Sequence, residues 1–303
     1  MHRKQLLPFI GLVCLTACDP QQYSAPTADF SAAVTAVVQG SKNAYQTVND
    51  TAAREQATKM VASGDPNKFN PKEIRPFLPD EDLKIRYTLL DGLQAYGATL
   101  AGLTNKAQTE MDRQAAAVAA SLESLKGNDR LTHSFREVKG ATAEEINGLV
   151  TGVDALAKLI MSRKINKELP AMLKQAQPTI EGIAYLMAKE IGAPPGNPEP
   201  GRLRGRLWRS YDDLMAAQVT MISQDQSVSE RRQDLAKLPD LVAQQRAADK
   251  ALAATQAAFG RMVSAHKALL EVGTNPGGFK AAITALLAEV KDVQTFYGKL
   301  PSQ

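Results

Sequence analysis

Apolar residues recur at steps of three and four positions along most of the chain, which is the spacing of one face of an α-helix. Alternating runs of Val, Ile and Thr, the pattern of half-buried strands, are absent from the sequence. Alanine is abundant, together with Leu, Gln, Lys, Arg and Glu, and these residue types favour helices. The pattern predicts an all-α protein. We expect an elongated bundle of five to seven helices, some long and coiled-coil-like, forming one domain over residues 28–303.

Two stretches have the clearest helical periodicity. The first runs from about residue 27 to residue 62 and is followed by a proline-rich segment that extends to residue 79. The second spans about residues 80–127, with acidic residues at its start, where the helix dipole favours them. After Leu103 its apolar steps become four, four and four, which resembles a stutter in a coiled coil. One straight helix of this length would span roughly 65–70 Å, so the stretch predicts a rod-like bundle.

Local signals divide the second half of the chain into further helices. A Thr-x-x-Glu sequence at residues 142–145 has the form of a capping box, and a Ser-x-x-Glu sequence at residues 227–230 can cap another helix. Residues 192–201 hold four prolines and three glycines, which predicts a break. Pro178 is expected to kink its helix or to begin another. Residues 275–278 are expected to form a turn before the last helix.

The first 18 residues combine a positively charged start, a short apolar stretch and small residues before a cysteine. Arg3 and Lys4 carry the charge, residues 6–15 form the apolar stretch, and Leu15-Thr16-Ala17-Cys18 closes the segment. A membrane span needs about 20 apolar residues, roughly twice the length of this stretch. The pattern resembles the lipobox of bacterial lipoprotein signal peptides.

This resemblance implies a location in the bacterial envelope and a lipid anchor in a membrane. Residues 1–17 would be a signal peptide, the thiol of Cys18 would receive a diacylglycerol, and the amine released by cleavage would be acylated. Two or more acyl chains anchor a protein stably, whereas one chain holds it only marginally. Residues 18–27 would form a short extended tether that keeps the folded part close to the periplasmic face of its membrane. The alternative is that Cys14 and Cys18 are ordinary cysteines in a signal or core segment.

Asp19 would occupy the second position of the mature chain. By resemblance to enterobacterial lipoproteins, an aspartate at this position favours retention in the inner membrane. The outer membrane is the alternative location, because the sorting rule differs among bacteria.

Charge and composition narrow the class of protein. The chain has 36 Lys and Arg residues against 32 Asp and Glu residues, and loss of the signal peptide would bring the two numbers closer. A near-balanced surface implies neither a nucleic-acid footprint nor a polybasic lipid-binding tail. The hydrophobic fraction of 44% is ample for a core, and the aromatic fraction of 5% fits slim helix interfaces.

Residues for metal binding and nucleophilic catalysis are sparse. Beyond the signal segment the histidines are His133 and His266, and neither belongs to a His-x-x-x-His or Glu-x-x-His pair, so no metal or cofactor is predicted. There is no Gly-x-Ser-x-Gly sequence and no phosphate-binding loop. We therefore predict no catalytic residues and a protein that is not an enzyme. The alternative is a small-ligand carrier or an enzyme with a site inside the bundle, around His266, Tyr211 or buried carboxylates.

One segment combines four arginines with the single tryptophan of the chain: Arg202, Arg204, Arg206, Trp208 and Arg209. As a surface patch it would contact lipid headgroups or an anionic partner, because Trp and Arg are enriched at interfaces. Arginine at a helix start opposes the helix dipole, which favours a functional reason for these residues. The alternative is an ordinary helix start with Trp208 packed against a neighbouring helix.

These features predict a membrane-anchored lipoprotein of the bacterial envelope whose helical part is a non-catalytic binding or scaffolding module. Its partner would be another envelope protein or a secreted protein, and the oligomeric state is left open. A third class is a membrane-remodelling protein, in which the glycines inside the helix patterns would serve as hinges.

Overall fold

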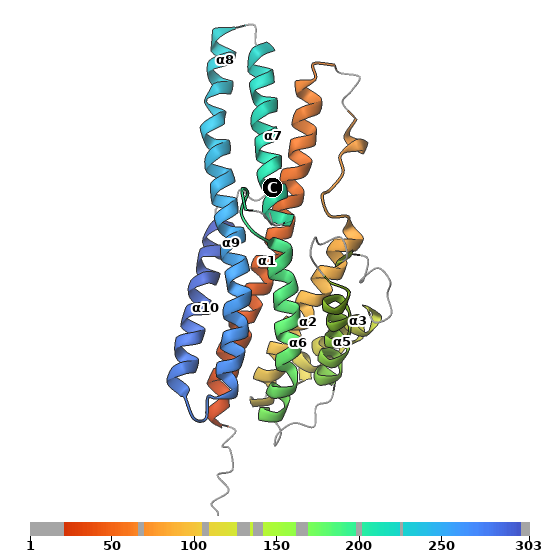
Figure 1. Ribbon diagram of the computed structural model, residues 1–303, viewed down its shortest axis with the longest axis vertical. Helices are drawn as coiled ribbons and strands as arrows, with labels where there is room; N and C mark the ends of the chain where they lie inside the picture. Colours follow the sequence, from red (N-terminus) through yellow and green to blue (C-terminus); the bar gives the residue numbers. More distant parts are fainter. Residues whose placement is uncertain are drawn as a thin grey trace, which may run out of the picture.

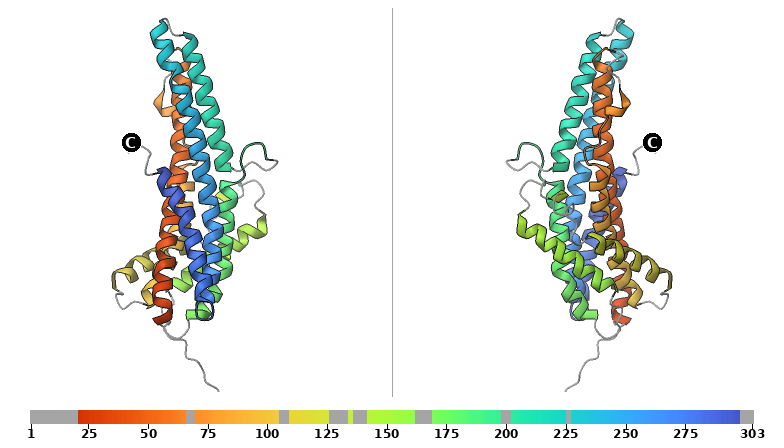
Figure 2. Two further views of the ribbon diagram at one scale, coloured as in Figure 1. Left: turned by 90° about the vertical axis from the view of Figure 1, so that its left-hand side faces the viewer. Right: turned by 90° about the vertical axis from the view of Figure 1, so that its right-hand side faces the viewer.

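The computed structural model describes residues 21–65, 70–104, 109–125, 134–135, 142–161, 169–197, 202–224 and 227–297. These residues form an elongated bundle of α-helices (Figure 1), and the side views show the same long, narrow shape (Figure 2). The predicted all-α bundle is confirmed. Cys18, Asp19 and His133 lie outside the described residues. None of the helices in the described ranges is long and apolar enough to cross a membrane.

The longest helix, α1, organises the bundle. It runs along most of the molecule and packs against α2, α7, α9 and α10 (Figure 1). Its buried face includes Phe30, Val34 and Val48, which follow the predicted apolar stripe. The elements in chain order are α1 (Gln21–Ala62), the short 3-10 helix η2 (Pro71–Glu73), α2 (Asp80–Thr104), α3 (Thr109–Leu125), α5 (Ala143–Met161), α6 (Leu169–Ile191), α7 (Arg202–Gln224), α8 (Val228–Leu235), α9 (Lys237–Leu270) and α10 (Pro276–Tyr297).

The two ends of the bundle are built from different helices. At the proximal end, where α1 begins at Gln21, α1 is joined by α2, α6, α10 and the last part of α9, with α3 and α5 outside them (Figure 1). At the distal end, α1 is accompanied by α7, α8 and the first part of α9. Helix α6 ends at Ile191 and α7 begins at Arg202, so the predicted break between them is confirmed.

The prediction of an extended tether is wrong from residue 21 onward. Residues 21–27 form the first turns of α1. Tyr23 and Thr27 are buried there, and the Thr27 hydroxyl donates a hydrogen bond to the Tyr23 carbonyl at 2.8 Å. Pro26 lies inside the helix, past its first turn, where a proline removes one backbone hydrogen bond and its ring presses against the carbonyl four residues earlier. Burial of these side chains therefore outweighs the turn signal of the proline.

The prediction of one helix over residues 80–127 is also wrong. Helix α2 ends at Thr104, and α3 lies against α2 instead of extending it. A Cβ atom added at Gly92 would lie 2.7 Å from Leu122 Cδ1, although these positions would be about 45 Å apart on one straight helix. The change of apolar step after Leu103 thus marks the approach to a chain reversal. The length of the bundle comes from α1, whose 42 residues span about 63 Å.

Three further local predictions concern the start of α8, the proline inside α6 and the start of α10. The capping box of α8 is confirmed: Ser227 Oγ accepts from Glu230 N, and the Glu230 carboxylate accepts from Ser227 N at 3.0 Å. Helix α6 continues through Pro178 and does not restart there. The predicted turn at residues 275–278 is instead the first turn of α10, where Asn275 Oδ1 accepts a hydrogen bond from Gly278 N at 2.9 Å.

Candidate functional site

The arginine-rich start of α7 faces mostly inward. Arg204 makes a two-point ion pair with Asp249 on α9, in which the Nε–Oδ1 and Nη2–Oδ2 distances are both 2.7 Å. Bidentate pairs of this kind combine charge with a fixed geometry. Arg206 reaches α1, where its Nη2 atom donates to Glu55 Oε2 at 2.8 Å. These two arginines therefore hold α7 against α9 and α1.

Glu55 is the centre of a polar cluster between α1 and α7. Its Oε2 atom also accepts a hydrogen bond from the Ser210 hydroxyl at 2.9 Å, and its Oε1 atom accepts one from Lys59 at 2.8 Å. Lys59 donates a second hydrogen bond to Asp213 at 2.7 Å, which lowers the pKa of Asp213. Because the buried carboxylate is matched by two cations and a hydroxyl, this cluster stabilises the contact between helices.

Trp208 and Arg209 have environments unlike those of the paired arginines. Trp208 is half-buried, which agrees with the alternative that it packs against the protein itself. Its indole Nε1 is buried without a hydrogen-bond partner among the described residues. Arg209 is exposed. The predicted surface patch is therefore wrong as a continuous feature, because carboxylates on α9 and α1 take Arg204 and Arg206 into the bundle.

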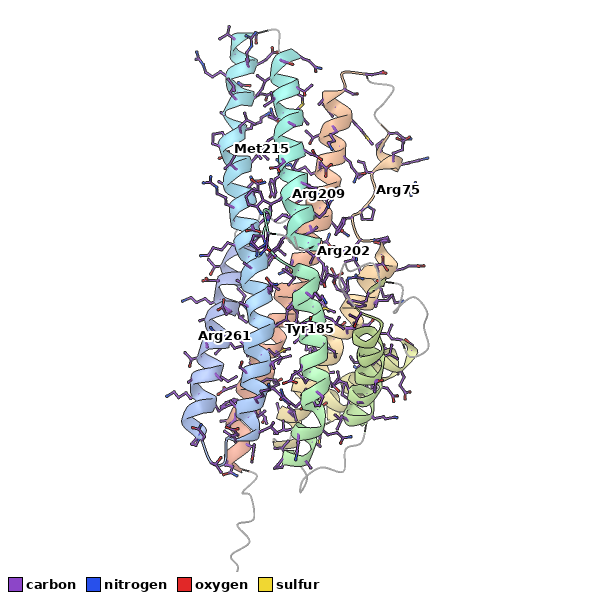
Figure 3. The ribbon with its side chains drawn as sticks, in the orientation of Figure 1. Arg75, Tyr185, Arg202, Arg209, Met215 and Arg261 are labelled. Carbon is purple, nitrogen blue, oxygen red and sulfur yellow. The ribbon has the colours of Figure 1, made fainter. Side chains whose placement is uncertain are left out.

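Arg202 connects this region to a second polar cluster. It lies at the level where α6 ends and α7 begins (Figure 3). Its Nη1 atom is 4.0 Å from Glu190 Oε1 on α6, and its guanidinium lies over the ring of Phe77 at 5.8 Å. Arg202 thus also points to groups of the protein itself.

A fully buried ion pair lies where α1, α2 and α6 meet. The side chains of Arg86 on α2 and Glu190 on α6 are both 0% exposed, and Arg86 Nε donates to Glu190 Oε1 and Oε2 at 2.8 and 2.9 Å. Arg86 Nη1 donates to the Ser134 hydroxyl at 2.6 Å. The Tyr45 hydroxyl donates to Glu190 Oε2 at 2.6 Å, and burial together with the Glu190 carboxylate raises the pKa of Tyr45. None of these groups can reach a solvent-borne substrate without a rearrangement of the core.

This ion pair is absent from the predictions above, although each of its residues falls on the apolar face of its predicted helix. Arg86 is three positions after Leu83 and four before Leu90, so it falls on the apolar face of its helix. Glu190 is three positions after Met187 on the apolar face of α6. Charged side chains are almost never fully buried unless they are paired, so two such residues on apolar faces indicate an internal ion pair.

His266 is the centre of a hydrogen-bonded chain across α2, α9 and α6. The Gln177 amide nitrogen donates to Glu181 at 2.9 Å, so its oxygen faces His266 Nδ1 and must accept the proton there. His266 Nε2 therefore accepts a hydrogen bond from the Tyr96 hydroxyl, at 2.8 Å. Burial lowers the pKa of His266 to about 4. Both ring nitrogens of the neutral imidazole are thus engaged, and neither has a lone pair free to bind a metal.

Tyr211, the other side chain expected at an internal site, lies apart from His266. Its neighbours are Thr51 and Arg54 on α1, and burial raises its pKa. Within the ranges that the structure describes, no group of three or more His, Cys, Asp or Glu side chains is close enough to hold a metal ion. His266 and Tyr211 therefore do not converge on a common site.

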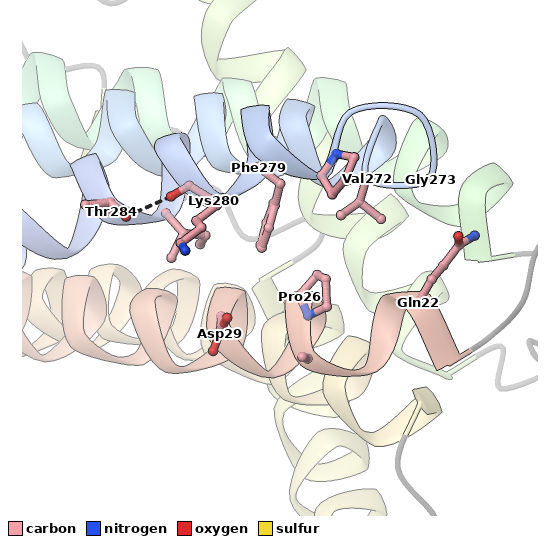
Figure 4. Close-up of a pocket in the computed structure, with 11 residues that line it drawn as sticks. Gln22, Pro26, Asp29, Val272, Gly273, Phe279, Lys280 and Thr284 are labelled. Atoms are coloured by element: carbon pink, nitrogen blue, oxygen red, sulfur yellow. Dashed lines mark hydrogen bonds between the residues drawn. The ribbon is translucent and has the colours of Figure 1, made fainter.

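A groove of about 520 Å³ lies at the proximal end, between the first turns of α1 and of α10 (Figure 4). Pro26 and Phe279 face each other across it, and Asp29 and Lys280 lie at its edges (Figure 4). Its lining residues are Gln22, Ala25, Pro26, Asp29, Val272, Gly273, Pro276, Phe279, Lys280, Ile283 and Thr284. The groove is mainly apolar, and this distinguishes it from the paired polar clusters of the interior.

A second groove, of about 540 Å³, lies between α5 and α6. Small residues form much of its wall, including Gly148 and Gly152 on α5 and Gly182 on α6. Tyr185, on the visible face of α6 in Figure 3, lines one side and is exposed. Neither groove is lined by His266 or Tyr211.

The distal end carries several exposed apolar side chains. Val219 near the end of α7, Val228 at the start of α8 and Leu235 at its end are 54%, 70% and 50% exposed. Val61, in the last turn of α1, is 56% exposed, and this turn also belongs to the distal end. A contiguous apolar patch marks a surface that contacts another molecule, and these exposed side chains are the candidates for such a surface at the distal end.

The chain was compared with known proteins at three levels: family models, curated proteins and solved structures. No protein-family model, curated protein or solved structure matches this chain.

Proposed function

We propose that this protein is a lipoprotein of the bacterial envelope, anchored at Cys18, whose helical bundle is a non-catalytic binding module for another envelope protein or a secreted protein. The observation that carries the proposal is the position of the lipobox relative to α1. The sequence Leu15-Thr16-Ala17-Cys18 ends only three residues before the first residue of α1. An anchor at Cys18 would therefore hold the proximal end at the membrane.

The direction of α1 determines which end of the bundle an anchor at Cys18 would hold away from the membrane. Helix α1 leads from the proximal end toward the distal end over about 63 Å. The distal end, with Val219, Val228 and Leu235 exposed, would then be presented away from the bilayer. This arrangement supports a module that meets its partner at a distance from the membrane.

The chemistry of the interior also supports a binding role. Arg86 and Glu190 neutralise each other in the core, and both nitrogens of His266 are engaged by neighbouring side chains. Groups that are fully matched within the protein are poor candidates for acid–base catalysis, because a catalytic group must touch its substrate. The distal apolar side chains have no such internal role.

Lipid modification can be tested by expressing the full-length chain and a Cys18→Ser variant in bacteria and measuring the mass of the N-terminal peptide. For the unaltered chain we expect a peptide that begins at Cys18 and carries a diacylglyceryl group and an amide-linked acyl chain. The Cys18→Ser variant should carry neither. An unaltered chain with an unmodified Cys18 would refute the anchor.

Partner binding can be tested by placing a photo-crosslinking amino acid at Val228, with Ser264 as the matched control. Both positions are exposed, but Ser264 lies on the part of α9 that belongs to the proximal half. In intact cells of the source bacterium we expect one dominant protein adduct from position 228, absent from position 264 and lost when Val219 is changed to Asp. Equal adduct patterns at 228 and 264 would exclude the distal end as the binding surface.

A further inference from the structure

We propose that the groove between α1 and α10 seats one of the acyl chains attached at Cys18. This inference rests on the acylation proposed above. It adds a lipid-binding site to the proximal end of the bundle and assigns it to the protein's own anchor.

The groove has the surface that an acyl chain requires. The buried side chains of Phe279 and Ile283, 4% and 6% exposed, line it together with Val272. Pro26 adds an apolar face from α1, opposite Phe279 (Figure 4). Its volume of about 520 Å³ lies within the ~300–1,000 Å³ typical of small-molecule sites. An acyl chain would therefore lie against apolar side chains from both helices.

The length of the groove also fits. Its α1 residues extend from Gln22 to Asp29, about 10 Å along the helix, and its α10 residues extend from Pro276 to Thr284, about 12 Å. One acyl chain spans about half of the ~30 Å hydrocarbon core of a bilayer, or about 15 Å. A chain that enters the groove beside Gln22 would thus run along it, with its end near Thr284.

Cys18 is close enough to supply this chain. It is four residues before Gln22, which lines the groove. Even fully extended, four residues span at most about 14 Å, so the acyl attachment point lies within that distance of Gln22. A chain tethered so closely has an effective concentration in the millimolar range, which favours it over a free amphiphile. This tether is the reason to assign the groove to the protein's own lipid.

Seating one chain is compatible with anchoring. The proposed modification supplies three chains, and two chains in the bilayer are sufficient for stable attachment. A chain held along α10 would also fix the proximal end against the membrane surface. The distal end would then keep a defined orientation, which a flexible anchor would not provide.

The test uses acyl chains that carry a photoactivatable diazirine. The full-length protein is produced in bacteria fed with the diazirine fatty acid, purified and placed in lipid nanodiscs, and its intact mass is measured before irradiation. After irradiation we expect adducts on the α10 peptide that contains Phe279 and Ile283. Ala25→Phe, which fills the groove from α1, should reduce these adducts about tenfold, because a well-packed site does not accept the added volume. Ala32→Phe, also at an exposed position of α1 but outside the groove, should leave them unchanged.

The remaining outcomes separate the two proposals. An intact mass without acyl chains would overturn both the anchor and the seating of its chain. Acylated protein with adducts only on bilayer lipids, or with equal adducts in Ala25→Phe and Ala32→Phe, would overturn the groove site and leave the anchor standing. In a second arm the protein is unlabelled and the nanodisc phospholipid carries the diazirine. Adducts on α10 in this arm, with none from the protein-borne chain, would assign the groove to bilayer lipid and overturn the proposal.

Discussion

Arg86 and Glu190 form an ion pair with no exposure to solvent, although they are 104 residues apart in the sequence. Arg86 Nε contacts both carboxylate oxygens, Arg86 Nη2 also donates to Glu190 Oε1, and Tyr45 donates a further hydrogen bond to the same carboxylate. A buried charge without its partner is far more costly than a buried pair. This relationship therefore makes α2 and α6 depend on each other for stability.

Glu190→Gln should destabilise the protein by about 3–5 kcal/mol, because it leaves the Arg86 charge buried without a counter-charge. The free energy of unfolding from urea titration, followed by circular dichroism, measures this loss. The double variant Arg86→Met/Glu190→Leu removes both charges and should recover a large part of the stability.

The control for this prediction is Asp91→Asn. Asp91 pairs with Lys42 at 2.6 Å, but the two side chains are 39% and 26% exposed, so the change should cost no more than about 1 kcal/mol. Equal losses for Asp91→Asn and Glu190→Gln would contradict the assignment of the core pair as a major stabilising contact.

The stability of the bundle should fall between pH 6.5 and pH 4 because of His266. Burial lowers the pKa of this residue to about 4 in the folded protein, whereas an unfolded histidine has a pKa of about 6.5. In this window the unfolded chain binds a proton that the folded chain does not, so stability decreases as the pH falls. The two pKa values imply a contribution of about 3 kcal/mol that is fully present above pH 6.5 and lost at pH 4.

Unfolding free energies of the unaltered protein and of His266→Gln at several pH values between 7 and 4 test this prediction. The variant cannot titrate at this position, so its stability should depend less on pH within the window. Carboxylates distant from His266 titrate in both proteins and cancel in the comparison, whereas Glu181, whose pKa is lowered mainly by Lys267 and Gln177 and also by the charge of His266, belongs to the His266 effect. Parallel curves for the two proteins would show that His266 does not carry the effect.

Gly92→Ala and Gly260→Ala should change stability in opposite directions. A Cβ atom added at Gly92 would lie 2.7 Å from Leu122 Cδ1 and 2.9 Å from Cδ2, so the buried Leu122 must shift, at a packing cost of about 1–3 kcal/mol. The helix propensity of alanine returns about 1 kcal/mol of this cost, so the net loss should be up to about 2 kcal/mol. A Cβ atom added at Gly260 meets nothing within 4 Å, and alanine should stabilise this exposed helical position by about 1 kcal/mol. Thermal unfolding of both variants measures the difference. A stabilising Gly92→Ala would contradict the close packing of α3 on α2.

Arg204→Met and Arg209→Met distinguish a structural arginine from a surface arginine. Arg204 makes two charged hydrogen bonds to Asp249, and its loss should cost about 2–3 kcal/mol. Arg209 is exposed, so its replacement should change the free energy of unfolding by less than about 0.5 kcal/mol. Urea titration of both variants measures the two losses. A loss for Arg209→Met as large as that for Arg204→Met would contradict the assignment of Arg204 as the structural arginine and Arg209 as the surface arginine.

Patterns among residues close together in the sequence determined the fold class and many helix ends. Steps of three and four predicted helices because the backbone hydrogen bonds of a helix join residues only four positions apart. The break at residues 192–201 and the capping box at Ser227 are similarly local, and both are present in the structure. The sequence ending at Cys18 that resembles a lipobox is also a local signal, and both the lipobox and the anchor it implies stay predictions of the sequence alone.

Only the tertiary structure decided which helix faces meet. The apolar spacing over residues 80–127 is compatible with one long helix and with two helices folded together, and the contact of Leu122 with Gly92 distinguishes them. Helical spacing can indicate that a side chain faces inward, but it does not identify what lies opposite. Arg204 and Arg206 find their carboxylates 45 and 151 residues away, on α9 and α1, because burial of apolar faces brings those helices beside α7.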